Sequence, residues 1–212
     1  MSELTRRKFI LNSLGVLLLP AFPAVAAALP RTPSQTAGPF YPLELPLDND
    51  NDLTQVQGFA RPALGKITDL SGRILAGDGR PLAGMRIEIW QCDANGRYHH
   101  PEDSRPNAPD EGFQGHGHTY SDDQGRYRFR TIHPVHYPGR TPHIHVAALP
   151  DGQRQFVTQL YVAGEARNES DWLYRRIPVE QRGLVTAEFR PVSGSGVQYT
   201  ANWDLVLGVS PA

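Results

Sequence analysis

From residue 66 onward, apolar and polar residues alternate along several short segments. Residues 67–74 and 85–90 show this alternation clearly, and a cluster of Gly, Asp and Pro at 77–84 separates them. Successive side chains of a strand point to opposite faces, so alternation predicts strands with one buried face. A turn cluster between two such segments predicts an antiparallel pair.

The remaining chain repeats this pattern and shows little sign of helix. Alternation predicts strands at residues 126–132, 184–190 and 199–207, and a β-branched, apolar composition predicts two more at 142–149 and 155–162. No segment keeps a helical period for three turns, and residues 168–181 predict a short helix or a turn-rich lid. The sequence therefore predicts an all-β fold, an antiparallel β-sandwich of short strands.

Residues 98–120 stand out as one long polar run, rich in His, Pro, Gly and Asp. Loops of this length inside a compact domain tend to be functional or disordered. We therefore predict that long loops at one end of the sandwich form a functional site.

The first 28 residues predict a targeting segment. Residues 5–10 carry two adjacent arginines and a lysine, an apolar run follows at 14–19, and small residues come next. This order is typical of a secretory signal, and the paired arginines resemble a twin-arginine signal. The alternative is a membrane anchor, but the apolar stretch is short and Pro20 and Pro23 interrupt it. We expect export to the periplasm or beyond, without stable membrane anchoring.

Residues 29–65 predict an extended arm ahead of the domain at 66–212, because turn formers dominate and no helical period appears. The acidic run 48–52 imitates the start of a calcium loop. However, Leu53 and Phe59 stand where such a loop needs glycine and glutamate. The run predicts a solvated turn.

Composition narrows the choice of partners. The chain has 212 residues, with 20 Gly and 19 Pro, and a formal net charge of −1. Without a basic surface or a basic run beyond the first residues, nucleic acid is not an expected partner. Cys92 is the only cysteine, so no intramolecular disulfide can form, and a small buried hydrophobic side chain is the favoured interpretation.

Residues 137–145 concentrate the candidate chemistry. His143 and His145 flank one apolar residue, so in a strand both imidazoles project from the same face and could bind one metal. Tyr137 lies just upstream, next to a Pro-Gly turn signal, and Tyr98 stands in a similar setting. A His-x-His pair alone is common in β proteins. Its combination with two tyrosines is the informative feature.

At this point the chain resembles the intradiol ring-cleaving dioxygenases, the family of catechol 1,2-dioxygenase and protocatechuate 3,4-dioxygenase. The resemblance rests on landmarks at residues 36–42, 72–90, 95–98, 113–117, 122–132, 137–138, 140–145 and 158–161. It implies a prealbumin-like sandwich in which 66–212 is catalytic, and a non-haem Fe(III) cofactor. It also implies a catecholic substrate that is cleaved with O2 between the hydroxylated carbons to a muconate-type acid.

The resemblance also assigns roles to individual residues. It implies that the iron ligands are Tyr98, Tyr137, His143 and His145. Tyr137 would leave the metal when substrate binds and act as a base, Arg140 would stabilise negative charge on the substrate, and Gln159 would line the pocket. The chain departs from the family pattern by lacking the helical N-terminal domain of the catechol branch, by a shorter 137–143 segment and by His118 in place of an arginine.

Several alternatives stay open. The other histidines are expected to be exposed or to form supporting hydrogen bonds, namely His99, His100, His116, His118, His133 and His136; the roles of His116 and His118 are undecided. A non-catalytic transthyretin-like or carboxypeptidase-regulatory-like module would share the glycine-rich hairpin. A zinc or copper hydrolase or oxidase is disfavoured because no His-Glu-x-x-His helix is present. The sequence leaves open a homo-oligomer and the choice among plain, carboxylated, hydroxylated and alkylated catechols.

Overall fold

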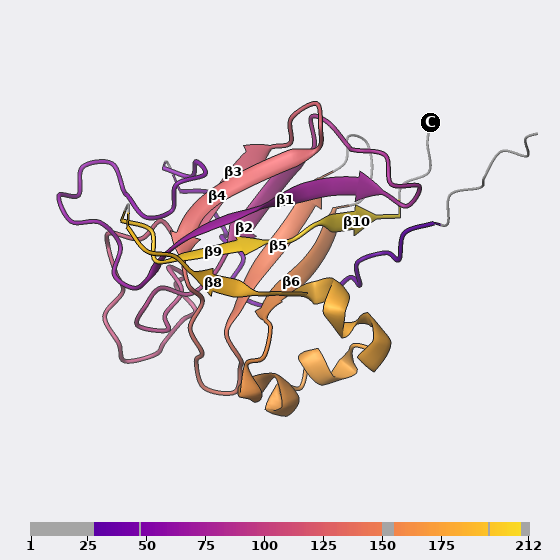
Figure 1. The fold of residues 1–212 in the computed structure, drawn as a ribbon. Coiled ribbons are helices and arrows are strands. Elements are labelled where there is room, and N and C mark those ends of the chain that lie inside the picture. The colour runs from indigo at the N-terminus through magenta and orange to yellow at the C-terminus, as the bar shows by residue number, and fades with distance from the viewer. Residues whose placement is uncertain (1–27, 47, 150–154, 195, 209–212) are drawn as a thin grey trace, which may run out of the picture.

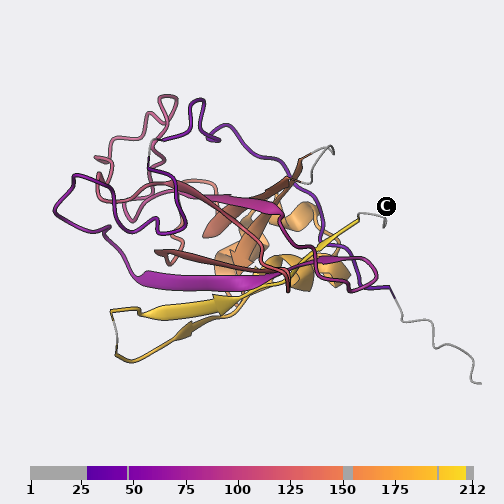
Figure 2. The same cartoon turned by 90° about the horizontal axis from the view of Figure 1, so that it is seen from above.

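Two five-stranded sheets packed face to face form the body of the protein. This computed structural model describes residues 28–46, 48–149, 155–194 and 196–208. The strands are β1 (Ile67–Ala76), β2 (Arg86–Trp90), β3 (His116–Tyr120), β4 (Arg126–Ile132), β5 (His143–Leu149), β6 (Phe156–Val162), β7 (Thr186–Ala187), β8 (Phe189–Pro191), β9 (Tyr199–Asn202) and β10 (Leu205–Leu207). The predicted all-β sandwich is confirmed (Figures 1 and 2).

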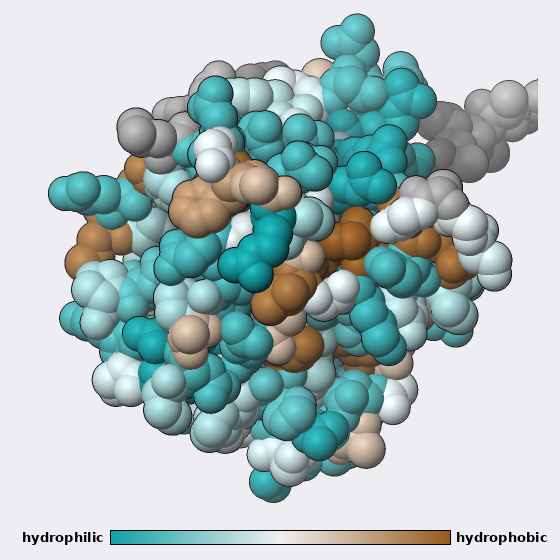
Figure 3. Space-filling view, turned by 90° about the vertical axis from the view of Figure 1, so that its left-hand side faces the viewer, coloured by the Kyte–Doolittle hydropathy of each residue, from teal (hydrophilic) through white to brown (hydrophobic). Residues whose placement is uncertain are grey.

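The inward-facing apolar residues of both sheets make one core. Leu70 and Ile74 of β1, Ile87 of β2 and Phe129 of β4 are each fully buried there, and Ile144 of β5 joins them. These are the apolar positions of the alternating segments, so the core face is the one that the sequence pattern predicts. On the face seen in Figure 3, hydrophilic residues predominate and apolar residues form only scattered patches.

The sheets are mixed, whereas the sequence indicated antiparallel strands. Most pairs are antiparallel, but β1 pairs in parallel with both β9 and β10, and β6 pairs in parallel with β7. These partners are joined by long connections rather than hairpins, which permits the parallel direction. Between β9 and β10 the backbone of Trp203 crosses Gly72, where an added Cβ would lie 1.7 Å from the Trp203 carbonyl oxygen. Only glycine fits that crossing.

Strand β3 corrects the prediction of one uninterrupted loop at 98–120. It pairs antiparallel with β2, although its sequence lacks an apolar face. Gly117 occupies the inward position, and Leu53 from the arm fills the space; a Cβ on Gly117 would lie 2.6 Å from Leu53 Cδ1. Because the buried apolar group comes from another segment, periodicity within 116–120 could not indicate the strand.

The segment after β6 forms three 3₁₀ helices instead of a regular helix. They are η1 (Ala166–Ser170), η2 (Tyr174–Arg176) and η3 (Val179–Val185). This agrees with the turn-rich form of the prediction for 168–181. The strand predicted at 184–190 also begins later than expected, because residues 184–185 belong to η3.

The arm runs along both sheets before it enters β1 (Figure 1). The backbone N–H of Thr32 donates to Val206 O at 3.0 Å, and that of Gln35 donates to Val157 O at 2.8 Å. The predicted targeting segment at 1–28 lies outside the described residues except for Ala28. Across the described ranges, no helix is long and apolar enough to cross a membrane.

Candidate metal centre

The outer face of the β3-β2-β5-β6-β7 sheet carries the candidate site. Strand register places His116, Trp90, His145 and Gln159 side by side in one row across β3, β2, β5 and β6. All four are at most 2% exposed, because the arm covers this face. Alternation in β5 sends Ile144 into the core, and the histidines on either side of it therefore face outward together.

The four predicted metal ligands converge above this row. The phenol oxygen of Tyr98 lies 3.4 Å from Nε2 of His143. Ring centroids are 5.8 Å apart for Tyr98 and Tyr137, 5.5 Å for Tyr137 and His143, and 4.9 Å for His143 and His145. The structure thus brings together residues from two loops and one strand.

Both histidines present a nitrogen suited to metal binding. Nδ1 of His143 lies 2.6 Å from the Thr141 carbonyl oxygen, which fixes a proton on Nδ1 and leaves Nε2 free to face Tyr98. The ring of His145 stacks on Trp90 with centroids 4.9 Å apart and planes 9° apart. Burial lowers the pKa of His143 to about 3 and that of His145 well below its usual range. Both imidazoles are therefore neutral, as metal ligands must be.

The phenols need a cation to ionise. Burial raises the pKa of Tyr98 well above its ordinary value, and burial also raises that of Tyr137, which Arg140 partly offsets. Among the described residues, no group of three or more His, Cys, Asp or Glu is placed to hold a metal. The phenol oxygens are the further donors that lie beside the two imidazoles. Two phenolates and two neutral imidazoles fit a hard, highly charged cation such as Fe(III).

Arg140 reaches the centre with its guanidinium fixed on three sides. Nε donates to Oδ2 of Asp171 at 2.8 Å, Nη2 donates to Oε1 of Gln159 at 2.5 Å, and Nη1 lies 3.5 Å from the phenol oxygen of Tyr137. Asp171 is 1% exposed and also accepts the backbone N–H of Thr141. The arginine is therefore held in place beside a tyrosine.

Gln159, which is predicted to line the pocket, lies beneath the arm on β6. It is fully buried. Its backbone N–H donates to Oε1 of Gln35 at 3.1 Å, and its Nε2 donates to Thr36 O at 3.2 Å. Its Oε1 accepts hydrogen bonds from Nη2 of Arg140 and from the hydroxyl of Tyr161, so Gln159 connects the arm to that guanidinium.

The arm also forms a wall of the centre. The ring of Phe40 stacks on Tyr98 with centroids 4.8 Å apart. Gly38 adopts a φ of 71°, and a Cβ there would lie 3.4 Å from Cε1 of His145. Glycine allows this left-handed turn. Next to Phe40, the phenol of Tyr41 donates to Glu88 at 2.8 Å and anchors the arm on β2.

The six remaining histidines lie in different environments. His136 is exposed, and Nδ1 of His118 lies 2.7 Å from the Asn49 carbonyl oxygen. His100 and His116 are buried, and Nδ1 of His100 accepts the backbone N–H of Glu102 at 3.2 Å. His116 lies 3.6 Å from the carboxylate of Glu88. Both belong to the wall of a cavity of about 460 Å³ beside Tyr98.

Sequence reasoning missed the carboxylates that hold this site. Asp171 and Glu88 are buried and paired, yet neither stands in a pattern that distinguishes it from a surface acid. Asp171 precedes Trp172 in a segment without clear periodicity. Glu88 occupies a polar position in the alternating pattern of β2. Such a position ordinarily faces solvent. Only the covering arm makes it internal.

Comparison with known proteins places the chain in a family. Residues 36–208 match the family model described as "Dioxygenase". The protocatechuate 3,4-dioxygenase beta chain of Burkholderia cepacia is 35% identical over 149 residues, covering 66% of this chain and 63% of the relative. The alpha chain from the same organism is 31% identical, with 81% and 90% covered. This chain therefore spans less than two thirds of the beta chain.

Solved structures that are similar to this chain support the same family. The dioxygenase domain of a dioxygenase carbohydrate-binding protein fusion from Streptomyces sp. SirexAA-E superimposes with a TM-score of 0.67 at 30% identity, covering 85% of this chain and 100% of that one. An intradiol ring-cleavage dioxygenase from Tetranychus urticae has the same fold, with a TM-score of 0.66 at 20% identity. The chain belongs to the intradiol ring-cleavage dioxygenase family.

Proposed function

We propose that this protein is a non-haem Fe(III) intradiol dioxygenase. It opens the ring of a catechol-type aromatic with O2, between the two hydroxylated carbons, and releases a muconate-type dicarboxylic acid. The observation that carries the proposal is the convergence of Tyr98, Tyr137, His143 and His145, with the Tyr98 oxygen 3.4 Å from His143 Nε2.

The donor set supports iron in the ferric state. With both phenols ionised, the two negative charges leave a trivalent cation with a net charge near +1, and the neutral imidazoles add none. Anionic oxygen donors favour the higher oxidation state over the lower one. When bound, Fe(III) would supply a centre that a catecholate can chelate. Such chelation would make the catecholate ring susceptible to O2.

The protein's own residues supply orientation and proton transfer. Tyr137 is only partly buried, and its oxygen lies 3.5 Å from Arg140 Nη1, so its phenolate is the candidate base for a substrate hydroxyl. The guanidinium of Arg140 is fixed by Asp171 and Gln159, so it can stabilise negative charge on the substrate without reorganising. The arm over the site excludes water.

The test is an oxygen-uptake screen of the purified protein, with metal content measured in parallel. Catechol, protocatechuate, hydroxyquinol and alkylcatechols are offered, and products are identified by mass. One iron per chain and a product containing both atoms of O2 would support the proposal. Full iron loading without oxygen uptake on any catechol would argue instead for a non-catalytic sandwich module.

We further propose that residues 1–28 direct export by the twin-arginine route, which places the enzyme in the periplasm or outside the cell. The support is the pattern of charge, apolar run and small residues in that segment. Substrates would then be catecholic compounds met outside the cytoplasm.

A further inference from the structure

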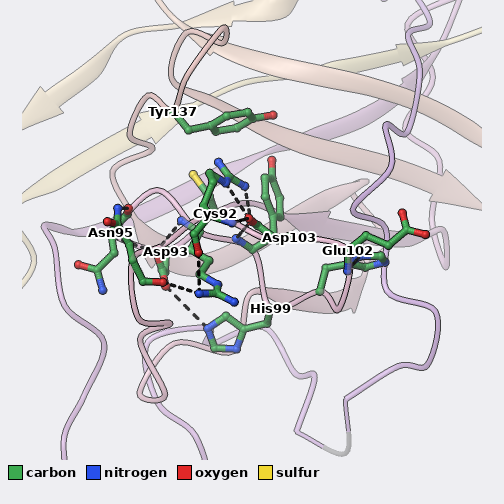
Figure 4. A network of polar contacts seen from close by, with 12 residues as sticks. Cys92, Asp93, Asn95, His99, Glu102, Asp103 and Tyr137 are labelled. Carbon is green, nitrogen blue, oxygen red and sulfur yellow. Dashed lines mark hydrogen bonds and ion pairs between the residues drawn. The ribbon is translucent and has the colours of Figure 1, made fainter.

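A second guanidinium lies against the ring of Tyr137, away from the Arg140 side chain. The central carbon of the Arg105 guanidinium is 4.3 Å from the ring centroid of Tyr137, and 5.7 Å from that of Tyr98. Arg105 comes from the long segment between Tyr98 and β3. Figure 4 shows Tyr137 above Asp103 and Cys92 in the polar network of this segment. Tyr137 is therefore contacted by Arg140 at its oxygen and by Arg105 on its ring.

Asp103 connects this guanidinium to the other tyrosine. Its Oδ1 accepts a hydrogen bond from Nε of Arg105 at 2.7 Å, and its Oδ2 pairs with Nη2. The same Oδ2 accepts the backbone N–H of Tyr98 at 2.7 Å. Asp103 is only 2% exposed. One buried ion pair thus links the backbone of Tyr98 to the ring of Tyr137.

The third nitrogen of Arg105 favours contact with the aromatic ring. Nη1 is buried and has no hydrogen-bond acceptor within the described part of the chain. The negative face of an aromatic ring attracts a cation and can accept an N–H group. The nearby face of Tyr137 is the available partner. A planar guanidinium can lie along a ring, whereas a lysine ammonium is a point charge without such a face.

The backbone beneath Arg105 is held independently of the ring contact. Nη1 of Arg97 donates to Arg105 O at 2.8 Å and to Asn107 O at 2.6 Å. Arg97 therefore braces the same segment, but its guanidinium binds main-chain carbonyls. This difference supplies a matched control.

We propose that Arg105 is a positioning residue that fixes the ring of Tyr137 in the orientation in which its oxygen lies 3.5 Å from Nη1 of Arg140. The consequence for iron and turnover rests on the proposed function. The ring contact itself does not, and it can be measured in metal-free protein.

The first test uses 3-fluorotyrosine labelling and fluorine NMR of the metal-free full chain. The chain has eight tyrosines, and the Tyr137 signal is the one lost in Tyr137→Phe. We expect Arg105→Gln and Arg105→Lys to move or broaden this signal, and Arg97→Gln, which removes only contacts to main-chain carbonyls, to affect it less. Arg105→Lys keeps the charge beside Asp103 and serves if Arg105→Gln fails to fold. An unmoved Tyr137 signal in a folded Arg105 variant, or an equal change in Arg97→Gln, would overturn the proposal.

The second test uses the iron-loaded protein. Arg105→Gln is expected to keep one iron, shift the visible absorption maximum and lower kcat about tenfold while KM changes little, because a misplaced reacting group costs turnover. Arg97→Gln is expected to lower kcat less than Arg105→Gln does. If no variant and no parent binds iron, the proposed function fails, while the fluorine signal still decides the role of Arg105.

Discussion

Arg140 donates a hydrogen bond of 2.5 Å from Nη2 to Oε1 of Gln159, and Gln159 is in turn bonded to Gln35 and Thr36 of the arm. The guanidinium that faces Tyr137 is therefore positioned by a segment more than 100 residues away in sequence, since Gln35 and Gln159 are 124 residues apart. The arm is part of the site and does not merely cover it.

The Gln159→Leu variant should separate the effect on turnover of this hydrogen-bonded link from the arm to Arg140 from any effect on metal binding. Leucine leaves the four metal ligands intact but removes the acceptor for Arg140, so the guanidinium loses one of its three contacts. We expect iron content to stay at the parent level and kcat to fall about tenfold to a hundredfold. Steady-state oxygen uptake with metal analysis checks this. Parent-level turnover would show that this link has no role.

The two tyrosines should give the protein a reddish colour, because phenolate bound to Fe(III) absorbs visible light by charge transfer. We expect Tyr98→Phe and Tyr137→Phe each to lose part of this absorption. Visible spectra and iron analysis of both variants measure the effect. Unchanged metal content and spectra in both variants would contradict the assignment of these ligands.

Arg140→Ala should keep iron and lose turnover. Arg140 is not one of the metal ligands, but it is the cation nearest the phenol oxygen of Tyr137, where substrate charge is expected to develop. A loss of about a hundredfold or more in kcat is typical for removing one such group. Unaltered oxygen uptake with a catechol would count against this role.

Glu88 should stabilise the protein in a pH-dependent way. Burial alone would raise its pKa, but the nearby His116 and hydrogen bonds from Tyr41 and Arg86 outweigh burial and lower it from 4.5 to about 2. A carboxylate with a lowered pKa contributes stability that is fully present above pH 4.5 and is lost as the pH falls toward 2. Urea unfolding across this window should show a steeper loss in the parent than in Glu88→Gln. Equal slopes would exclude Glu88 as the cause.

Near neutral pH, Tyr41→Phe should weaken the contact between arm and sheet. The variant leaves the ring packed on Trp90 and removes only the hydrogen bond to Glu88. Loss of a hydrogen bond to a charged group costs about 1.5–3 kcal/mol. Urea unfolding at neutral pH measures the free energy of unfolding, and a change well below this range would show that this hydrogen bond contributes little to holding the arm.

Replacing both Arg6 and Arg7 by Lys should block export if the predicted signal is of the twin-arginine type. Full-length precursor is then expected to accumulate in the cytoplasm of an expressing bacterium, and cell fractionation measures it. Undiminished export of the double variant would redirect the interpretation to a general secretory signal.

The sequence by itself determined the β-sandwich and indicated the four candidate metal ligands. Alternation indicated which residues of β1, β2 and β4 face the core, because a strand has a period of two whatever it packs against. The same period placed His143 and His145 on one face. Turn signals beside Tyr98 and Tyr137 marked two loops able to approach that face.

The tertiary structure alone decided what surrounds those ligands. The strand at 116–120, the parallel partners of β1, and the buried carboxylates Asp103, Asp171 and Glu88 depend on contacts between distant segments. The local pattern of apolar and polar residues indicates which side chains can be buried together. It does not indicate which distant segment of the chain buries them. A loop aspartate looks the same in the sequence whether it is exposed to water or buried against an arginine. The residues that hold this site in place could therefore be identified only in the folded chain.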